Sequence, residues 1–110
     1  MVDFTLEETD KHKVVKLNGE VDLYCVGDLK KDLLKIIDDN GQGSSIVIDM
    51  QDLKYMDSSG IALMANLQKK LKAVDGKFSL VHVNEDIMNV LRLSALDSFF
   101  RIYDSMDSIP

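Results

Sequence analysis

Apolar residues along the chain recur with two different spacings, which predict two kinds of secondary structure. In three stretches they return every three or four positions with charged residues between them, as on one face of an amphipathic helix. The predicted helices cover residues 26–40, 58–74 and 85–96. Short runs rich in β-branched and aromatic residues separate these stretches and predict strands. The predicted strands cover residues 3–8, 12–17, 44–50, 77–83 and 99–105.

Turn-forming residues separate the predicted elements. A polar turn at residues 9–11 joins the first two strands into a hairpin. Three pairs that end in glycine mark the ends of elements, namely Asn18-Gly19, Asn40-Gly41 and Asp75-Gly76. The run "SSIVIDM" is nearly continuously β-branched, which is typical of a strand covered on both faces, and "QDLKY" after it is a polar bridge. We therefore expect the strand at 44–50 to be buried on both faces.

The order of the predicted elements indicates the fold class. It reads β-β-α-β-α-β-α-β within a single domain, residues 1–110. Strands that are joined through helical crossovers pair in parallel, whereas a hairpin pairs antiparallel. The sequence therefore predicts an α/β domain with a mixed, mostly parallel sheet, an antiparallel edge hairpin and three amphipathic helices.

Composition and charge exclude several classes of protein. The chain has 110 residues, of which 45% are hydrophobic, enough for a soluble domain with its own core. No apolar run approaches the roughly 20 residues of a membrane span, and the N-terminus has no signal-peptide pattern. The single cysteine, Cys25, excludes an internal disulfide, favours a cytoplasmic location and is expected to be a small buried residue. A net charge of -6 argues against a nucleic-acid partner. We expect neither a metal nor a cofactor.

The stretch "MDSSG" at residues 56–60 places two adjacent hydroxyl groups where the second helix begins. Ser58 or Ser59 could cap the helix, because a serine oxygen accepts a hydrogen bond from an amide of the first turn. One cap is sufficient, and Asp57 could supply it instead. In that case at least one of the two hydroxyl groups remains free for another role.

Two catalytic interpretations of this stretch lack the residues that they require. A nucleophile elbow needs small residues two places on either side of its serine, and Met56 occupies one such place for Ser58. The two histidines, His12 and His82, both lie within predicted strands. An aspartyl-phosphate receiver could use Asp49 or Asp57, but it also needs paired carboxylates after the first strand to hold magnesium. We therefore predict no catalytic residue and a protein that is not an enzyme.

A phosphoacceptor is the third interpretation of the two serines. A helix N-terminus favours a bound phosphate through its free amides and its dipole. Phosphorylation adds nearly two negative charges without requiring the helix to unfold. Asp57, together with carboxylates from "GEVD" at residues 19–22, would make the modified site strongly acidic. A partner that fits the neutral hydroxyl would then lose affinity.

The segments "LNGEVDLYCVGDLKKDL", "IVIDMQDLKYMDSSGIALM" and "FRIYDS" resemble the STAS domain, in particular the anti-sigma factor antagonists. The resemblance implies a monomer that binds an anti-sigma factor, itself an ATP-dependent serine kinase, and thereby frees a sigma factor for transcription. It further implies that phosphorylation of Ser58 (or Ser59 as the second choice) ends this binding, and that a PP2C-type phosphatase restores it. The implied partner-binding residues are Glu20, Asp22, Asp57, Ser58, Ser59 and Gly60.

A departure from the family and two alternative functions accompany this resemblance. The family commonly has a glycine where this chain has Ala95, so we expect the turn after the third helix to close differently. A scaffold or sensor subunit of the same fold, without a phosphorylation cycle, is the alternative to the antagonist. An aspartyl-phosphate receiver is the less favoured alternative.

Overall fold

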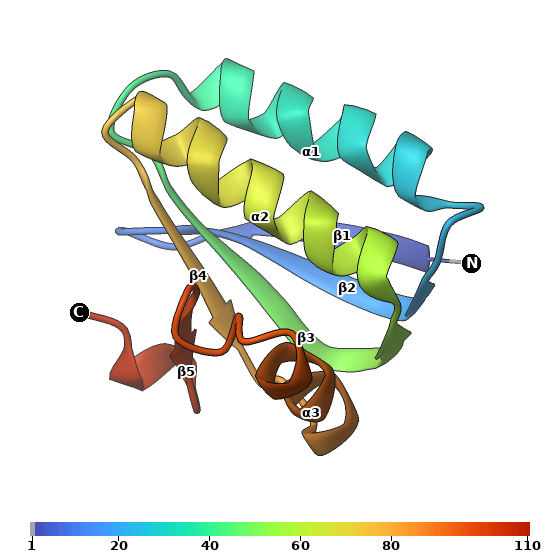
Figure 1. Ribbon diagram of the computed structural model, residues 1–110. Coiled ribbons are helices and arrows are strands. Elements are labelled where there is room, and N and C mark those ends of the chain that lie inside the picture. The colour runs from blue at the N-terminus through green and yellow to red at the C-terminus, as the bar shows by residue number, and fades with distance from the viewer. Residues whose placement is uncertain (1) are drawn as a thin grey trace.

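Five strands form one sheet in the computed structural model, which describes residues 2–110 (Figure 1). The strands are β1 (Val2–Glu8), β2 (Lys13–Val21), β3 (Ser45–Met56), β4 (Lys77–Val81) and β5 (Arg101–Tyr103). They lie in the sheet in the order β1-β2-β3-β4-β5, with β1 antiparallel to β2 and the other neighbours parallel. The predicted mixed sheet with an antiparallel edge hairpin is therefore confirmed.

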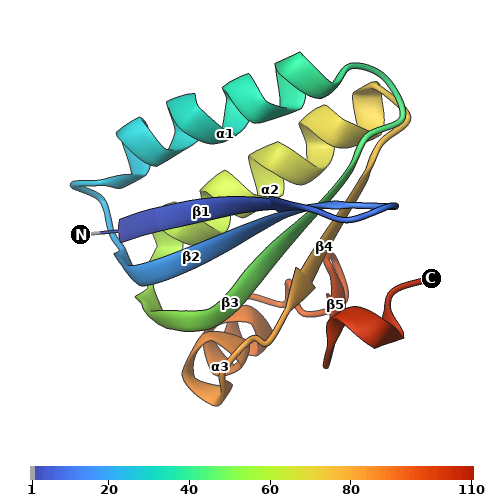
Figure 2. The same cartoon turned by 180° about the vertical axis from the view of Figure 1, so that it is seen from behind.

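Three α-helices accompany the sheet. They are α1 (Val26–Asn40), α2 (Ser58–Ala73) and α3 (Glu85–Leu93), and a short 3₁₀ helix follows at Met106–Ser108. Helices α1 and α2 lie side by side along one face of the sheet, while α3 lies apart from them near β3 (Figure 1). In the view from behind, no helix crosses in front of β1 and β2 (Figure 2). The predicted bounds of α1 agree with the structure.

The core lies mainly between the sheet and the pair α1 and α2. Side chains alternate between the two faces of a strand, so Ile46 and Ile48 of β3 pack into the main core. Val47 between them faces the opposite side, where it packs with residues that include Met106 and Ile109 of the C-terminal segment. Because apolar side chains cover both faces of β3, the prediction of a strand buried on both sides is confirmed.

Two predicted strand ends are wrong because β2 and β3 continue to pair beyond them. The Asn18-Gly19 pair does not end β2, which continues to Val21, and "QDLKY" belongs to β3 rather than to a bridge. Two irregularities in the register, at Lys16/Asn18 and Gly19/Glu20, accommodate the pairing. Gly19 takes a φ of 107°, which few other residues could adopt, so here the glycine supports an irregular strand rather than a turn.

The third helix ends earlier than predicted. It stops at Leu93 rather than at residue 96, because Ala95 adopts a left-handed φ of 56°. The Leu96 N–H donates to the Leu91 carbonyl at 2.8 Å, and the Ala95 N–H donates to the Arg92 carbonyl at 3.0 Å. This pair of bonds is the Schellman motif, in which the left-handed position usually belongs to glycine. The expectation that this turn closes differently is therefore wrong, since Ala95 itself adopts the left-handed conformation.

The last strand is shorter than predicted. It covers Arg101–Tyr103 rather than residues 99–105.

Replacing Ala95 by glycine is expected to stabilise the protein. A left-handed backbone costs an alanine about 1 kcal/mol more than a glycine, so Ala95→Gly should raise the free energy of unfolding by roughly that amount. Ala62→Gly is the matched control, because Ala62 is exposed within α2 and its replacement should lower the free energy by a similar amount. Urea denaturation measures both, and an Ala95→Gly protein less stable than the original would contradict the expectation.

Candidate functional site

Asp57 joins three segments at the carboxyl end of β3. It is the N-cap of α2, and its Oδ1 accepts hydrogen bonds from the amides of Ser59 at 3.0 Å and Gly60 at 3.3 Å. Its Oδ2 accepts a hydrogen bond from the Leu23 amide, at 3.2 Å, in the turn between β2 and α1. The carboxylate therefore holds the start of α2 against that turn. This arrangement confirms that Asp57 can cap the helix in place of a serine.

The hydrogen bonds to Asp57 also determine its charge state. The Ser59 hydroxyl, 2.5 Å from Oδ1, is the largest influence that lowers the pKa of the Asp57 carboxyl below its usual value of 3.8. The amides of Gly60, Ser59 and Leu23 lower it further, while partial burial opposes them. Asp57 therefore carries its negative charge throughout the physiological pH range.

Replacing Asp57 is expected to lower stability in a pH-dependent way. Loss of an N-cap costs about 1 kcal/mol, so Asp57→Ala should lower the free energy of unfolding by roughly that amount at pH 7. Since the folded pKa lies below the unfolded value, the stabilisation is complete above about pH 3.8 and is lost as the pH falls through the folded pKa. Urea titrations of both proteins at pH 7 and pH 3 measure the difference. A difference in the free energy of unfolding between the two proteins that is the same at both pH values would contradict this account.

The two serines differ in what their hydroxyl groups contact. The Ser59 hydroxyl donates to the Asp57 carboxylate, and Ser59 is half-buried. Ser58 is exposed in the first turn of α2, and within residues 2–110 its hydroxyl makes no hydrogen bond to the protein. The geometry therefore distinguishes two hydroxyl groups that are equivalent in the sequence. Of the two, only the Ser58 hydroxyl is both exposed and without a hydrogen bond to the described part of the chain.

Gly60 allows α2 to approach the ends of β2 and β3. It is buried, and a methyl group at this position would lie 2.9 Å from the Val21 side chain and would also collide with the Met56 side chain. Since contacts below 3.0 Å do not occur at a real Cβ, an alanine here would force its neighbours to move. Gly60 therefore permits the close packing under the site and, being buried, is not itself accessible to a partner.

The other two acidic residues predicted for the site occupy different positions. The Asp22 carboxylate accepts hydrogen bonds from the amides of Tyr24 at 3.0 Å and Cys25 at 3.1 Å, so it fixes the turn before α1. Glu20 is exposed at the end of β2, opposite Tyr55 of β3. Cys25 is half-buried and its thiol contacts the main-chain carbonyls of Glu20 and Asp22, so the prediction of a buried cysteine is wrong. Asp22 thus shapes the turn, while Glu20 presents its charge to solvent.

Two exposed apolar side chains lie next to this site, and the sequence pattern did not reveal them. Tyr24 is 94% exposed and Leu23 is 69% exposed, although both are large and hydrophobic. The Leu23 amide is the group that bonds to Asp57, so the pair is held beside the start of α2. They stand in a turn that belongs to neither periodic pattern, and such a placement is the one signal that could have identified them. Tyrosine is among the residues enriched at protein–protein interfaces.

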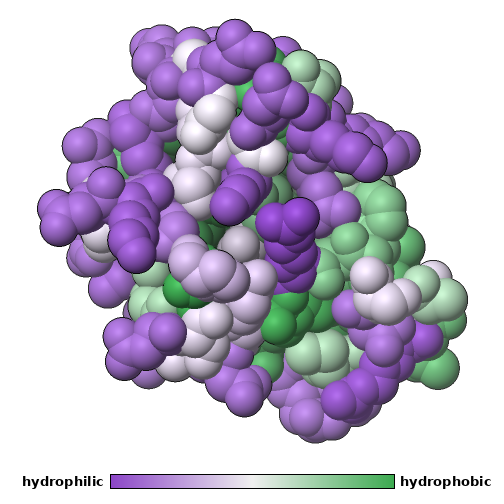
Figure 3. All heavy atoms as spheres, turned by 90° about the vertical axis from the view of Figure 1, so that its left-hand side faces the viewer, coloured by the Kyte–Doolittle hydropathy of each residue, from purple (hydrophilic) through white to green (hydrophobic). Residues whose placement is uncertain are grey.

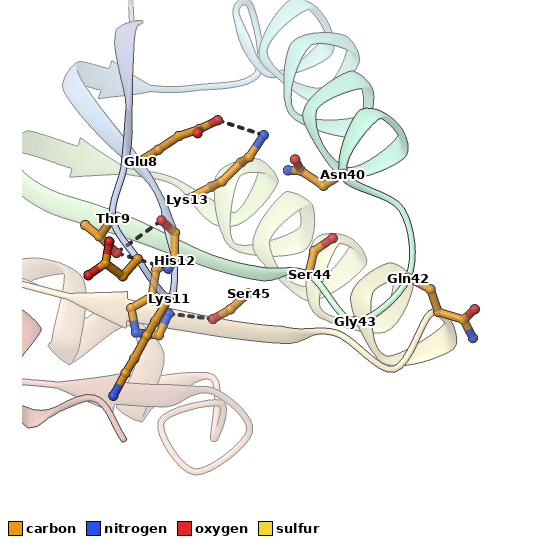
Figure 4. Close-up of a pocket in the computed structure, with 11 residues that line it drawn as sticks. Glu8, Thr9, Lys11, His12, Lys13, Asn40, Gln42, Gly43, Ser44 and Ser45 are labelled. Carbon is orange, nitrogen blue, oxygen red and sulfur yellow. Dashed lines mark hydrogen bonds and ion pairs between the residues drawn. The ribbon is translucent and has the colours of Figure 1, made fainter.

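Both histidines lie away from the two serines. His12 Nδ1 is 2.7 Å from Ser45 Oγ, beside a cavity of about 300 Å³ between the β1–β2 turn and the α1–β3 turn (Figure 4). Ser45 begins β3, whereas Ser58 follows the other end of that strand. His82 Nδ1 lies 2.9 Å from Oδ1 of the buried Asp49. Neither histidine can therefore act as a base for Ser58 or Ser59.

The carboxylates do not form a receiver site. Asp49 is buried within β3 and bonded to His82, and both oxygens of Asp57 accept hydrogen bonds. Among residues 2–110, no three histidine, cysteine or acidic side chains gather closely enough to hold a metal ion. In the same part of the chain no helix is sufficiently long and apolar to cross a membrane.

The fold described above is that of a STAS domain. The STAS family matches residues 3–109, so the chain belongs to that family. It is 26% identical to the anti-sigma-B factor antagonist of Staphylococcus aureus over 98 residues, which cover 89% of each protein. The family match therefore covers all but the first and last of the described residues.

Solved structures agree with this assignment. A putative anti-sigma factor antagonist from Thermotoga maritima superposes with a TM-score of 0.82 at 28% identity, covering 94% of this chain and 88% of that one. The antagonist SpoIIAA in its unphosphorylated form superposes with a TM-score of 0.78 at 25% identity, covering 96% of this chain and 92% of that one. The phosphorylated form of SpoIIAA from Bacillus also matches, with a TM-score of 0.71, 25% identity and 96% of both chains covered.

Proposed function

We propose that this protein is an anti-sigma factor antagonist whose binding is controlled by phosphorylation of Ser58. Without phosphate it binds an anti-sigma factor and so frees a sigma factor for transcription. The names of its relatives support this function, and a relative with the same fold exists in an unphosphorylated and a phosphorylated form. The partner also acts as the serine kinase, and a PP2C-type phosphatase reverses the modification.

The observation that carries this proposal is the state of the Ser58 hydroxyl. It is exposed, it makes no hydrogen bond within the described chain, and the capping role that a serine often takes belongs to Asp57. A kinase could therefore reach the Ser58 oxygen without breaking any contact of the fold. For the same reason the modified protein should stay folded, because the cap of α2 does not depend on the modified group.

Charge explains why the modification should end binding. Phosphorylation adds nearly two negative charges beside Asp57, which is already ionised at neutral pH. Asp22 shapes the adjoining turn and Glu20 is exposed at the end of β2, so several carboxylates come from the same end of the molecule. A partner surface fitted to a neutral hydroxyl would have to bury this added charge without a matching cation, which is strongly unfavourable.

Leu23 and Tyr24 give the proposed binding face its apolar part. Aromatic anchors, with tyrosine among the most frequent, commonly provide much of the energy of a protein interface, while their neighbours exclude water. Here they lie next to the phosphoacceptor, because the Leu23 amide is bonded to Asp57. The proposed face therefore consists of an apolar anchor beside a group whose charge can be changed. The domain itself performs no chemistry, acts in the cytoplasm and is a monomer when free.

The proposal predicts one modified residue. After incubation with the cognate anti-sigma kinase and ATP, mass spectrometry should locate phosphate on Ser58 alone. Ser58→Ala should abolish the incorporation, whereas Ser59→Ala should retain more than about half of it, since the Ser59 hydroxyl is bonded to Asp57 rather than free.

Two results would contradict this prediction. Phosphate on neither serine would favour the scaffold or sensor interpretation, in which Ser58→Ala has no effect on the cell's response. Acid-labile phosphate would indicate an aspartyl phosphate and hence a receiver. Because phosphoserine survives acid, brief acid treatment before the measurement separates the two modifications.

A further inference from the structure

A second cavity lies at the end of the molecule away from Ser58. It has a volume of about 250 Å³ and is bounded by the last turns of α2 and the beginnings of β4 and β5. The polar residues that line it are Gln68, Lys72, Lys77 and Arg101, and its apolar walls are Phe78 and Phe99. Hydrophilic and apolar surfaces meet at this end of the molecule (Figure 3). The proposed antagonist function uses none of these residues.

The charge of this cavity is opposite to the charge of the protein. The whole chain carries a net charge of -6, yet three cations and no acidic side chain are among the described residues that line the cavity. Four other cations of the described chain form ion pairs with carboxylates, namely Lys13, Lys16, Lys70 and Arg92. Lys72, Lys77 and Arg101 form none. These three positive groups are therefore available to an anion.

Stabilisation of the fold does not account for all three cations. Lys72 is in the last turn of α2, where a positive charge interacts favourably with the helix dipole. Lys77 and Arg101 begin β4 and β5, where no such dipole exists. Three separate elements thus each contribute one cation to the same cavity.

The apolar wall of the cavity includes an aromatic side chain that could contact a ring of the ligand. Phe99 is 40% exposed and packs edge to face against the buried Phe100, with ring centroids 5.1 Å apart. Its main-chain carbonyl accepts a hydrogen bond from the Gln68 side chain at 2.8 Å, which ties this loop to α2. Phe99 is therefore held in place, and an aromatic side chain so placed can pack against a flat ring.

We propose that this cavity binds a small aromatic anion, in which a single ring carries a phosphate or carboxylate group. The three cations recognise the anionic group, with Arg101 suited to two parallel hydrogen bonds. Phe99 contacts the ring. The volume limits the size, since typical pockets for larger ligands start at about 300 Å³ and this one holds about 250 Å³.

The test is a titration of the ¹⁵N-labelled protein with phenyl phosphate, followed by NMR. We expect saturable shifts that centre on Gly76, Lys77 and Arg101. Inorganic phosphate lacks the ring and phenol lacks the charge, so each should bind at least about tenfold more weakly than phenyl phosphate. Equal affinity for phenyl phosphate and inorganic phosphate would overturn the proposal, and so would shifts spread over the surface or no shifts at all.

Variants locate the binding. Lys77→Gln and Arg101→Gln should each weaken phenyl phosphate binding about tenfold, because each removes one charged hydrogen bond. Phe99→Leu keeps the apolar bulk but should reduce the affinity towards that of inorganic phosphate. Lys69→Gln is the matched control on the exposed side of α2 and should change the affinity less than about twofold. The spectrum of each variant verifies its fold, and unchanged affinity in the folded cavity variants would overturn the proposal.

Discussion

Phosphorylation of Ser58 should weaken binding of the anti-sigma factor by at least about 100-fold, which corresponds to about 2.7 kcal/mol. The interface would have to bury a dianion for which it has no partner, and an uncompensated buried charge costs several kcal/mol. Because Asp57 retains the cap of α2, the free energy of unfolding should change by less than about 1 kcal/mol. Calorimetry with the purified phosphoprotein and its partner measures the affinity, and urea denaturation measures the stability.

Matched substitutions separate the effect of charge from the effect of size. Ser58→Asp and Ser58→Asn introduce side chains of nearly equal shape, and only the first is charged. Aspartate carries about half the charge of phosphoserine, so we expect Ser58→Asp to lose about tenfold more affinity than Ser58→Asn. Equal losses for the two variants would show that bulk, rather than charge, disrupts the complex.

Replacement of Tyr24 should have the second largest effect on binding. A central aromatic anchor typically contributes 2 kcal/mol or more to an interface, so Tyr24→Ala should weaken the complex about 30-fold. The ring is 94% exposed in the free protein, so its removal should leave the free energy of unfolding almost unchanged. Calorimetric titration of the unphosphorylated Tyr24→Ala protein with the anti-sigma factor measures the loss of affinity.

Leu6→Ala is the control for an exposed apolar residue elsewhere. Leu6 is 42% exposed on β1, towards the hairpin end of the sheet, and should contribute little to the complex. If Tyr24→Ala and Leu6→Ala reduced the affinity equally, the apolar turn beside Ser58 would not be the anchor. A loss in Tyr24→Ala that came with unfolding would also remove the support for a direct contact.

The sequence predicted the elements well where local pattern and tertiary packing agree. The apolar stripe of α1 and the glycine after it define the same helix, and its predicted bounds hold. The pattern did not indicate that β2 and β3 pair beyond Asn18-Gly19, because the energy of that pairing comes from a strand distant in the sequence. The end of α3 was missed for a related reason, since Ala95 adopts a left-handed conformation that alanine avoids on its own.

The start of α2, which holds the candidate site, was predicted from the sequence, but the hydrogen bonds within it were only partly predicted. The motif located Asp57, Ser58 and Ser59, and the capping rule identified the aspartate as a possible cap. Which serine is free depends on a single hydrogen bond to Asp57, and adjacent identical residues carry no pattern that predicts it. The exposure of Tyr24 was likewise missed, because the only signal for it was the position of the residue in a turn outside both periodic patterns.

The tight packing at Gly60 restricts how this domain can diverge over evolutionary time. Hydrogen is the only substituent that fits between the helix start and the side chains of Val21 and Met56. A larger residue at this position would therefore require the Val21 and Met56 side chains to shift or to become smaller. Either change would loosen the packing beneath the first turn of α2, which carries Ser58.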